Sequence, residues 1–591
     1  MDMKHYKYLG YAMMAAGMLA ATSCSDFSDY NEAKLDSTPS GNLTLWENIS
    51  QNPQLSEFAS MVKKTGFDSE LNNTRYFTVW APMNGTFNQS ELATLTDSAL
   101  LVQFIKSHVA EYGHPATGLL NERIHTLNEK SFTFAGSGSY TFDGVDITAS
   151  NLPSNNGLIH MLNGAARFYP NLYEYIFMAQ GIDSLREQFR RYQVTTLDLD
   201  ASIKGPMVNG VQTYIDSVMI TYNTLTNQLN AQIANEDSSY TFLMPTNKAF
   251  SSTYDRIKSL YHFITTTVVQ DAENFTKAGD TKTKSISMDA EFLSDSLTRR
   301  VLFQNLVFSN TNMYNQWLVG KNTPSDTLRS TTRTKFSNPK DLVETYMVGQ
   351  PVEMSNGYAR IVDSLAFYPW ESFNPEISVS PRNYLANLFP ANAQAHRTQS
   401  IPDSLLAQIF GDKEVKRRNY SNYRYLWIDP GGDRVKPDFC INLPSVLSTT
   451  YNIYVVFLPS AMRMLGNDPR PNKLNFELSY CTESGTLASY KFSKAYADSL
   501  LTGGALPKLP TALNMNTAFE NDPTKLDSVF IGQFTFPVAY NGLGDYSPNI
   551  RVTSPLSVFS NDQLATYTRD VRIAAIVLKP VELEEFEAKK K

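Results

Sequence analysis

Two pairs of apolar stretches recur in the same order along the chain, each bounded by Asn, Gly or Pro. In the first pair, residues 77–87 match residues 240–250, with Thr, Pro, Asn and Phe at the same spacing. Each copy is typical of a buried strand that ends at proline, because proline has no amide hydrogen for the ladder. The asparagine that follows, Asn84 or Asn247, is predicted to cap the next helix.

The second pair matches residues 156–163 with residues 356–363, and Phe-Tyr-Pro follows both copies. Asn-Gly at the start of each copy predicts a left-handed turn, and the apolar run after it predicts a strand through the core. Two ordered matches predict a duplicated domain of helices and strands, at residues 43–170 and 171–371.

The second copy is longer than the first. In the first copy 75 residues separate Pro82 from Gly157, whereas 112 residues separate Pro245 from Gly357 in the second. Between the copies, residues 185–191 are predicted to form a helix and residues 197–201 a loop. The second domain is therefore expected to carry insertions.

After Trp370 the pattern changes to short apolar runs, at residues 451–458, 529–540 and 571–578, and to strict alternation at residues 474–480. Runs of this length between Gly, Pro and Asn indicate strands, and few segments have helical periodicity. We therefore expect an α+β multidomain protein in which residues 372–591 form a β-sandwich-like domain.

The N-terminus has the pattern of an export signal. Lys4 and Lys7 precede an apolar stretch at residues 9–21, which is too short to span a bilayer comfortably. The residues Ala-Thr-Ser that run into Cys24 resemble the lipobox of bacterial lipoproteins. That resemblance implies a signal peptide at residues 1–23 and fatty acylation, such as by palmitate, of Cys24. An ordinary secretory signal with a chance cysteine is the alternative.

Residues 24–42 form an acidic, Ser-rich tether in this interpretation. Its first residues are similar to the tag that sends lipoproteins to the exterior face of the outer membrane, although a solvated linker would have the same composition. The expected location is thus the outer membrane, lipid-anchored and facing the cell exterior.

Composition and charge exclude two classes of protein. With 42% hydrophobic and 18% charged residues, the chain has enough apolar surface to fold and too little charge to be mostly disordered. The net charge of −7 is spread along the chain and no basic stripe occurs. Nucleic acid is therefore not an expected partner.

The first copy resembles the fasciclin domain family through Ala81-Pro82 with Asn84 and through 156–160, its two signature boxes. The segments 104–109, ending in His-Val, and 124–128, containing Thr-Leu-Asn, also resemble that family. The resemblance implies α+β modules used in adhesion and extracellular recognition, without general enzymatic activity. In the second copy the His-Val is absent and residues 300–307 occupy its place.

No catalytic, cofactor or metal motif stands out in the chain. His108 and His160, which the family resemblance highlights, are predicted to be buried imidazoles that fix the fold, in preference to ligand-binding groups. A hydrolase needs only two carboxylates from anywhere in the chain. An enzyme with a carboxylate site in the C-terminal domain is therefore kept as an alternative.

The predicted ligand-binding surface is aromatic. Tyr423, Tyr425 and Trp427 alternate, so on a strand their rings would share one face on which a sugar can stack. Core packing is the alternative for these rings. Cys440 and Cys481 either form a disulfide in an oxidising exterior or are two buried thiols on strands.

These features predict a non-enzymatic surface lipoprotein that binds a glycan or peptide. The arrangement resembles accessory lipoproteins that work with a TonB-dependent transporter or with other surface lipoproteins in nutrient uptake. The alternative is a structural cell-surface adhesin.

Overall fold

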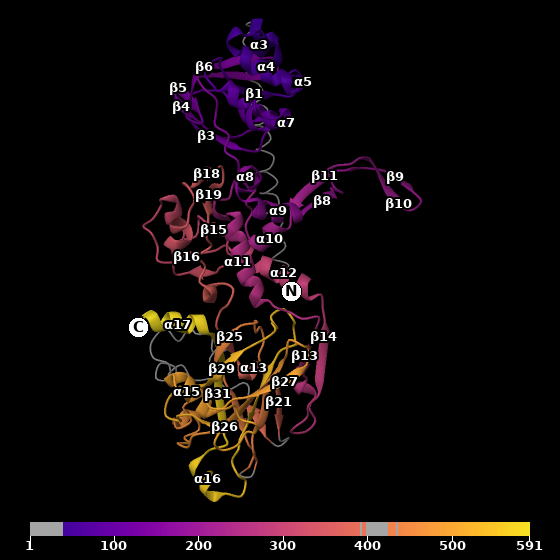
Figure 1. Ribbon diagram of the computed structural model, residues 1–591. Coiled ribbons are helices and arrows are strands. Elements are labelled where there is room, and N and C mark those ends of the chain that lie inside the picture. The colour runs from indigo at the N-terminus through magenta and orange to yellow at the C-terminus, as the bar shows by residue number, and fades with distance from the viewer. Residues whose placement is uncertain (1–38, 390–392, 397–423, 433–434, 591) are drawn as a thin grey trace, which may run out of the picture. The chain divides into compact units, whose positions relative to one another are not determined.

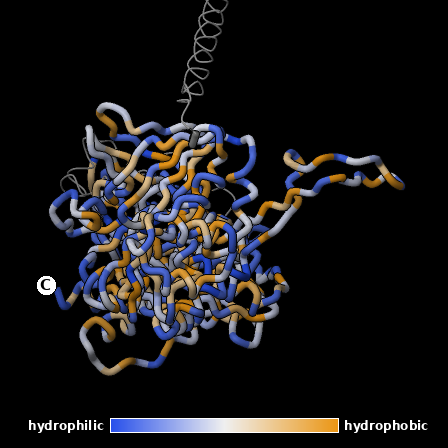
Figure 2. Tube along the Cα trace, turned by 90° about the horizontal axis from the view of Figure 1, so that it is seen from above, coloured by the Kyte–Doolittle hydropathy of each residue, from blue (hydrophilic) through white to orange (hydrophobic). Residues whose placement is uncertain are grey.

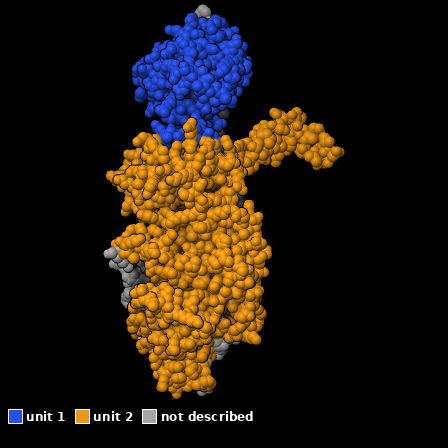
Figure 3. Space-filling view, viewed as in Figure 1, with its two compact units in different colours: residues 1–179, 232–240, 352–359 blue, residues 180–231, 241–351, 360–591 orange. Residues whose placement is uncertain are grey.

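The computed structural model describes residues 39–389, 393–396, 424–432 and 435–590 (Figure 1). Helices and strands are both abundant, which confirms the predicted α+β content. The described residues fall into two compact units, coloured separately in Figure 3. Unit 1 contains residues up to 179 with 232–240 and 352–359, and unit 2 contains the rest. The predicted signal peptide and most of the tether lie outside the described residues.

Unit 1 is built on a seven-stranded sheet with the order β2-β1-β7-β6-β5-β4-β3. Its central strands β1 and β7 run parallel, and every residue of both is buried. Alternate side chains of β1 enter two apolar clusters, with Val79 in one and Trp80 in the other, so the sheet is covered on both faces. The strands are β1 Phe77–Pro82, β2 Val109–Glu111, β3 Leu119–His125, β4 Ser131–Ser137, β5 Ser139–Phe142, β6 Val145–Ser154 and β7 Gly157–Leu162.

Short helices cover one face of this sheet. The first of them, α3, begins with a capping box in which Thr44 and Glu47 bond each other's backbone amides. The chain passes from η4, which ends at His108, directly into β2, which begins at Val109. These helices are η1 Pro39–Asn42, α3 Leu45–Gln51, η2 Pro53–Leu55, α4 Ser56–Lys64, α5 Asp68–Leu71, α6 Gln89–Leu92, α7 Asp97–Leu100, η3 Leu101–Ile105 and η4 Lys106–His108. Helix α8 Leu172–Met178 follows β7 and begins the second copy.

The second copy of the repeated segments forms a four-stranded sheet with the order β15-β12-β19-β18. Its strands are β12 Tyr240–Pro245, β15 Val307–Ser309, β18 Val352–Met354 and β19 Gly357–Val362. The helices of this region are α9 Asp183–Arg191, α10 Leu225–Leu229, α11 Asn247–Leu260, η5 Ala272–Asn274, α12 Ala290–Phe303, η6 Gln316–Val319 and η7 Asp341–Thr345. The helix predicted over residues 185–191 is confirmed by α9.

The same asparagine makes the same hydrogen bonds in both copies. The side chain of Asn156 or Asn356 accepts from the first amide of a helix and donates to two main-chain carbonyls. The groups are Leu45 N, Leu71 O and Asn73 O for Asn156, and Leu172 N, Ile233 O and Asn235 O for Asn356. Equal contacts at equal positions indicate that the two copies share one local fold.

The prediction that Asn84 and Asn247 cap the helices that follow them is wrong. Asn247 is the first residue of α11, and the side chain that caps this helix is that of Thr246. The Oδ1 atom of Asn247 accepts from Ser184 N in α9 at 2.8 Å, and Asn84 Oδ1 accepts from Glu57 N in α4 at 2.9 Å. Each asparagine therefore satisfies the start of a helix that precedes it in the chain.

Glycine follows each of the other two asparagines because the backbone of a neighbouring strand lies too close for a side chain. A Cβ atom on Gly157 would collide with the carbonyl oxygen of Phe77, and one on Gly357 with that of Tyr240. Gly157 does not have the positive φ that the Asn-Gly pair predicts, whereas Gly357 has φ +139°. Close approach is thus the requirement that both copies share.

The extra residues of the second copy and the segment before it form β-ribbons. Residues 193–223, named here the arm, consist of two paired ribbons: β8 Gln193–Leu197 with β11 Met219–Asn223, and β9 Ile203–Val208 with β10 Val211–Asp216 (Figure 1). The loop predicted over 197–201 separates β8 from β9, but the sequence did not predict the strands. A second hairpin comprises β13 Thr266–Gln270 and β14 Thr283–Ser287, and β16 Leu328–Arg329 pairs with β17 Lys335–Phe336.

After Trp370 the chain forms two antiparallel six-stranded sheets. One contains β20 Ile377–Val379, β22 Gln394–His396, β23 Leu426–Asp429, β25 Thr450–Phe457, β29 Asp527–Thr535 and β31 Val571–Pro580. The other contains β21 Leu385–Phe389, β24 Asp438–Asn442, β26 Lys473–Cys481, β27 Leu487–Lys491, β28 Phe519–Glu520 and β30 Asn549–Thr553. The apolar runs at residues 451–458 and 571–578 coincide with β25 and β31, and the alternating run with β26. The run at residues 529–540 is a strand only as far as Thr535, where β29 ends.

Helices in the described part of this region are few and short. They are η8 Pro369–Glu371, α13 Pro381–Tyr384, η11 Arg463–Leu465, α15 Lys494–Thr502, α16 Asn561–Thr566 and α17 Val581–Lys590. The ring of Phe586 in α17 packs against Tyr368 and Trp370, with centroids 5.0 and 4.5 Å away. The C-terminal helix is thereby held against the segment that follows the second copy.

The β13–β14 hairpin packs on the second of these sheets, although it belongs to the second copy in sequence. Val268 N lies 3.4 Å from Cys481 Sγ, and Asn387 Nδ2 donates to Ala272 O at 2.8 Å. Ala272 and Phe275 share an apolar cluster with Cys440. The insertion therefore covers part of the C-terminal sheet.

Candidate functional site

Unit 2 contains a cleft of about 880 Å³, named here the polar cleft. It lies between α11, the start of α12 and three segments of the C-terminal sheets. Its lining is mostly charged or hydroxylated: Asp255, Lys258, Ser259, His262, Thr265, Asp289, Glu291, Ser294, Ser448 and Glu483, with Phe263, Met288, Ala290 and Pro537 as the apolar part.

Helix α11 supplies one wall because its two faces differ. Phe250 and Ile257 are buried on the face that packs inward, whereas Asp255, Lys258 and Ser259 line the cleft. This division follows the helical period, which places residues of one kind every three or four positions. The opposite wall begins at Asp289, whose carboxylate accepts from Phe292 N and so caps α12.

Backbone hydrogen bonds hold the third wall in place. Ser448 N donates to Leu260 O at 2.9 Å, and Ala539 N donates to His262 O at 2.7 Å. Both bonds join the end of α11 to loops of the C-terminal sheets. The cleft is therefore bounded by fixed backbone and not by side chains alone.

An ion pair and a side-chain hydrogen bond cross the cleft. Lys258 pairs with Glu291, and His262 Nε2 lies 3.0 Å from Glu483 Oε2. The His262 and Glu483 side chains are 47% and 64% exposed, so a dissolved molecule can reach them. Carboxylates, an ammonium group, an imidazole and hydroxyls offer both donors and acceptors for a polar ligand.

The histidines highlighted by the sequence lie elsewhere and are structural. His108 Nδ1 donates to Phe104 O at 2.7 Å, and its Nε2 accepts from Ala166 N at 2.9 Å. His160 Nε2 donates to His114 O at 2.9 Å, and its ring stacks on Trp80. Burial lowers the pKa of each of the two imidazoles to about 4. Both are therefore neutral near pH 7, and the backbone already occupies the nitrogens that a ligand would need.

The aromatic surface predicted for ligand binding is corrected in part. Tyr425 is 2% exposed and packs in an apolar cluster with Val456 and Leu465, so its ring is not available for stacking. Trp427 is half-buried beside the same cluster, and the guanidinium of Arg572 lies 4.3 Å from its ring centroid. Tyr423 lies outside the described residues. The alternative of core packing is confirmed for Tyr425, because the face of β23 that carries these rings lies against an apolar cluster.

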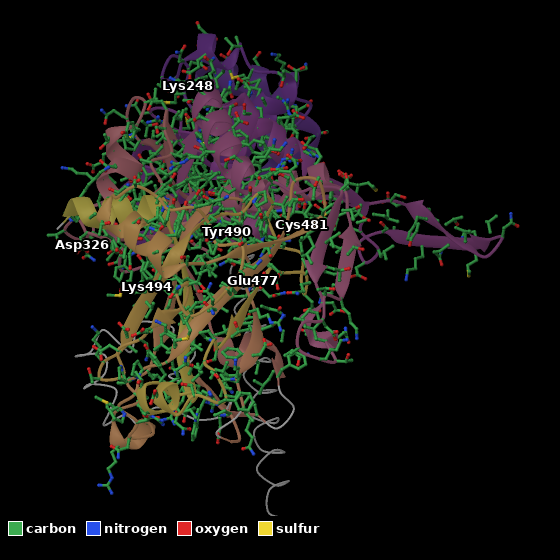
Figure 4. All side chains as sticks on the ribbon, turned by 60° about the horizontal axis from the view of Figure 1, so that its bottom comes forward. Lys248, Asp326, Glu477, Cys481, Tyr490 and Lys494 are labelled. Atoms are coloured by element: carbon green, nitrogen blue, oxygen red, sulfur yellow. The ribbon has the colours of Figure 1, made fainter. Side chains whose placement is uncertain are left out.

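The cysteines are two separate buried thiols, which corrects the disulfide alternative. Cys440 on β24 lies opposite Arg551 of β30, and Arg551 lies opposite Glu477 on β26, four residues before Cys481. Two strand spacings and four residues of rise separate the cysteines by well over about 10 Å, whereas a disulfide needs Cα atoms within about 7 Å. Figure 4 labels Cys481 near Glu477.

Burial also raises the pKa of the Cys440 thiol to about 12 and raises that of Cys481. Both thiols are therefore protonated and poorly nucleophilic near neutral pH. Cys24, the predicted site of acylation, lies outside the described residues. Among the described residues, no group of three or more His, Cys, Asp or Glu side chains is placed to hold a metal ion. No helix in the described ranges is long and apolar enough to span a bilayer.

Sequence reasoning did not find the polar cleft. Its walls come from segments around residues 255–294, 448, 483 and 537, and nothing in the local pattern of any one of them indicates a site. The only signal was the polar stripe of α11, which is also the pattern of an ordinary solvated helix face.

Comparison with known protein families gives a match to part of the chain. The fasciclin domain family matches residues 53–165, within the predicted first domain, so a fasciclin domain is present. Such domains are found in cell-adhesion proteins. Comparison with curated protein sequences gives no match.

Two solved structures are similar at low identity. A FAS1 domain pair from the insect cell adhesion molecule fasciclin I is 11% identical, with a TM-score of 0.19, and the match covers 55% of this chain and 99% of that chain. An N-terminal endo-1,4-beta-D-xylanase from Clostridium thermocellum complexed with xylohexaose is 7% identical, with a TM-score of 0.17, covering 34% of this chain and 26% of that chain.

Proposed function

We propose that this chain is a non-enzymatic, lipid-anchored protein of the bacterial outer membrane that binds a polar extracellular ligand, a glycan or peptide, in the polar cleft. The observation that carries the proposal is the cleft of about 880 Å³ with its mainly charged and hydroxylated lining. Its volume lies within the range of about 300–1000 Å³ that is usual for ligand sites. The protein would hold its ligand for an outer-membrane transporter of the TonB-dependent class or for another surface lipoprotein.

The lining favours a polar ligand over an apolar one. Burying an apolar group against Lys258, Glu291 and Glu483 would desolvate charges without giving them new partners. Sugar hydroxyls and peptide amides can instead replace the water around these groups bond for bond. This argument supports the ligand class and leaves the individual ligand to experiment.

A glycan and peptide array probed with the full chain is expected to show a ligand whose binding depends on the cleft. We expect a double substitution of Lys258→Ala and His262→Ala to weaken binding of that ligand at least tenfold, because the hydrogen bonds that the ammonium group and the imidazole make to it are lost. The matched control is Lys64→Ala, which breaks an exposed ion pair with Asp97 in unit 1. If the double variant and the control bind every array ligand like the parent, the cleft is not the ligand site.

The anchor part of the proposal is supported by the small residues that run into Cys24. Cells fed a palmitate analogue are expected to label the parent chain and to leave a Cys24→Ala variant unlabelled. Ser23→Ala is the control, because a small residue remains before the cysteine. Equal labelling of the parent and the Cys24→Ala variant would remove the anchor from the proposal.

A structural adhesin is the second candidate, because the fasciclin domain at residues 53–165 belongs to a family found in cell-adhesion proteins. Cells that display the chain would then attach to matrix-coated surfaces or to other cells more strongly than cells that lack it. Attachment that survives the Lys258→Ala, His262→Ala double variant, together with a silent array, would favour adhesion over ligand capture.

A further inference from the structure

The arm concentrates exposed apolar side chains. Of the 24 large apolar side chains that are exposed in the described part of the chain, eleven belong to residues 193–223. They include Met207, Val211 and Ile215, which are 66%, 66% and 76% exposed. Figure 2 shows hydrophobic positions recurring along the extended ribbon. Soluble proteins rarely expose a contiguous apolar surface of this kind unless another molecule covers it.

The arm has a defined structure and is fixed at its base. Asn223 Nδ2 donates to Phe189 O at 2.6 Å, which joins the end of β11 to α9. At the tip, Asn209 and Gly210 have φ of 52° and 78°, the left-handed conformation of a two-residue hairpin turn. Midway, the Asp198 carboxylate accepts from the amides of Asp200 and Ala201 and so closes the turn between β8 and β9.

Apolar side chains occupy both faces of the arm. Val208 lies opposite Val211 in the register of β9 and β10, so these two share a face, and Met207 lies on the other. Near the base, Tyr222 lies opposite Val194, and Met219 lies opposite Leu197 on the reverse face. A two-stranded ribbon is only marginally stable in water when nothing packs on it. Cover on both faces would add the missing apolar burial.

The hydrocarbon of a membrane does not suit the arm. Both of its ribbons are two-stranded within the described residues, so each strand has one edge whose N–H and C=O groups have no strand partner. In hydrocarbon each such group would cost several kcal/mol. Lys204 is the only basic residue of the arm, whereas Asp198, Asp200 and Asp216 are acidic. Attraction to anionic lipid would require the opposite balance.

Pairing with the arm of a second copy is also disfavoured. Pro206 removes one amide donor from β9, and the register of β10 shifts at Gln212, Tyr214 and Asp216. Proline and bulges are devices that prevent strands from pairing edge to edge. Two arms would also bring like charges together, since each has three acidic residues and one basic residue.

The size of the arm fits a protein partner. A two-stranded ribbon is about 10 Å wide and rises about 3.3 Å per residue, so residues 193–208 give about 500 Å² on each face. Both faces together give about 1000 Å², which is more than the roughly 800 Å² that each partner contributes to a stable complex. We propose that the arm inserts into an apolar groove of a different protein, and that basic side chains at the rim of this groove meet Asp198, Asp200 and Asp216. The proposal does not depend on the ligand of the polar cleft.

The test begins in intact cells that produce the full chain with a photoreactive amino acid at Val211 or Ile215. The control position is Phe559, which is 81% exposed in the C-terminal part. Both arm positions are expected to give one cross-linked product with a second protein, identified by mass spectrometry, and the control position none. The identified protein is then purified and its affinity for the chain measured. We expect Val211→Thr with Ile215→Thr to weaken this affinity at least tenfold, and Phe559→Ser to leave it unchanged.

Threonine keeps the β-branched shape at both positions, so amide hydrogen exchange of residues 203–216 should stay like that of the parent and show that the arm still folds. Three results would overturn the proposal: no arm-specific cross-link, an affinity that the arm variant does not change, or a different occupant. Sedimentation of the purified chain as a dimer that the arm variant dissociates would identify a second copy. Binding to vesicles of phosphatidylethanolamine and phosphatidylglycerol that the variant abolishes would identify lipid.

Discussion

Replacing Lys130 with methionine is expected to lower the free energy of unfolding of unit 1 by about 3 kcal/mol. The Lys130 side chain is 4% exposed, and its ammonium group pairs with Glu174 at 2.7 Å and with Glu236 at 2.5 Å. Methionine fills the space but leaves two carboxylates together without a cation. The expected loss lies at the low end for a broken buried pair, because Glu174 is 38% exposed. Urea unfolding followed by tryptophan fluorescence measures it.

The hydrogen-bond network around Lys130 is the reason why its loss should cost more stability than the loss of an exposed lysine. Asn171 Nδ2 also donates to Glu236, at 3.0 Å, and Glu174 closes the capping box of α8, so removal of the cation disturbs several bonds at once. Adding Glu236→Gln to the Lys130→Met variant should restore part of the lost stability, since it removes one of the uncompensated charges. Lys64→Met, at an exposed pair, should cost less than about 1 kcal/mol. Equal losses for Lys64→Met and Lys130→Met would contradict this account.

Acid is expected to destabilise unit 1 well before its carboxylates titrate. His108 and His160 have a pKa of about 4 in the folded chain, against 6.5 for the free side chain. Above pH 6.5 both imidazoles are mainly neutral in the folded and in the unfolded chain, so the free energy of unfolding does not depend on their titration. Between pH 6.5 and pH 4 they bind protons in the unfolded chain but not in the folded chain. The free energy of unfolding therefore falls as the pH is lowered through this range. From pH 7 to pH 5 each imidazole should cost about 2 kcal/mol.

Hydrogen exchange of the β1 amides, corrected for the intrinsic effect of pH, measures this local loss of stability. Burial also lowers the pKa of His114, which adds to the loss in the same direction. A His108→Asn variant should be less stable than the parent at pH 7 but should lose less stability between pH 7 and pH 5. A variant whose pH dependence equals that of the parent would show that His108 is not a buried neutral group.

Strands β1 and β7 of unit 1 could be predicted because a strand that is buried on both faces appears in the sequence as a mainly apolar run. Every residue of β1 and β7 is buried, and only Thr78 and His160 interrupt their apolar runs; duplication made the pattern recognisable in β12. The bonds of Asn84 could not be predicted. A side chain that accepts from a helix amide 27 residues away leaves no spacing that differs from that of a local cap.

The polar cleft and the arm escaped prediction for different reasons. His262 and Glu483 are 221 residues apart, and only the folded chain brings them together. The arm did contain a hairpin signal, Asn209-Gly210 between apolar residues. Apolar residues occur on both faces of the ribbon, so apolar and polar positions do not alternate along its strands. The alternation that indicates a half-buried strand was therefore missing.

The β13–β14 hairpin determines where a C-terminal fragment of the protein can begin without exposing buried residues. A fragment starting at residue 372 would keep every strand of the two C-terminal sheets but lose Ala272 and Phe275, which cover Cys440, and the Val268 amide beside Cys481. Two inert thiols would then face solvent next to bare apolar surface, a combination that promotes oxidation and aggregation. Recombinant expression of this region should therefore begin before β12 and retain residues 266–287.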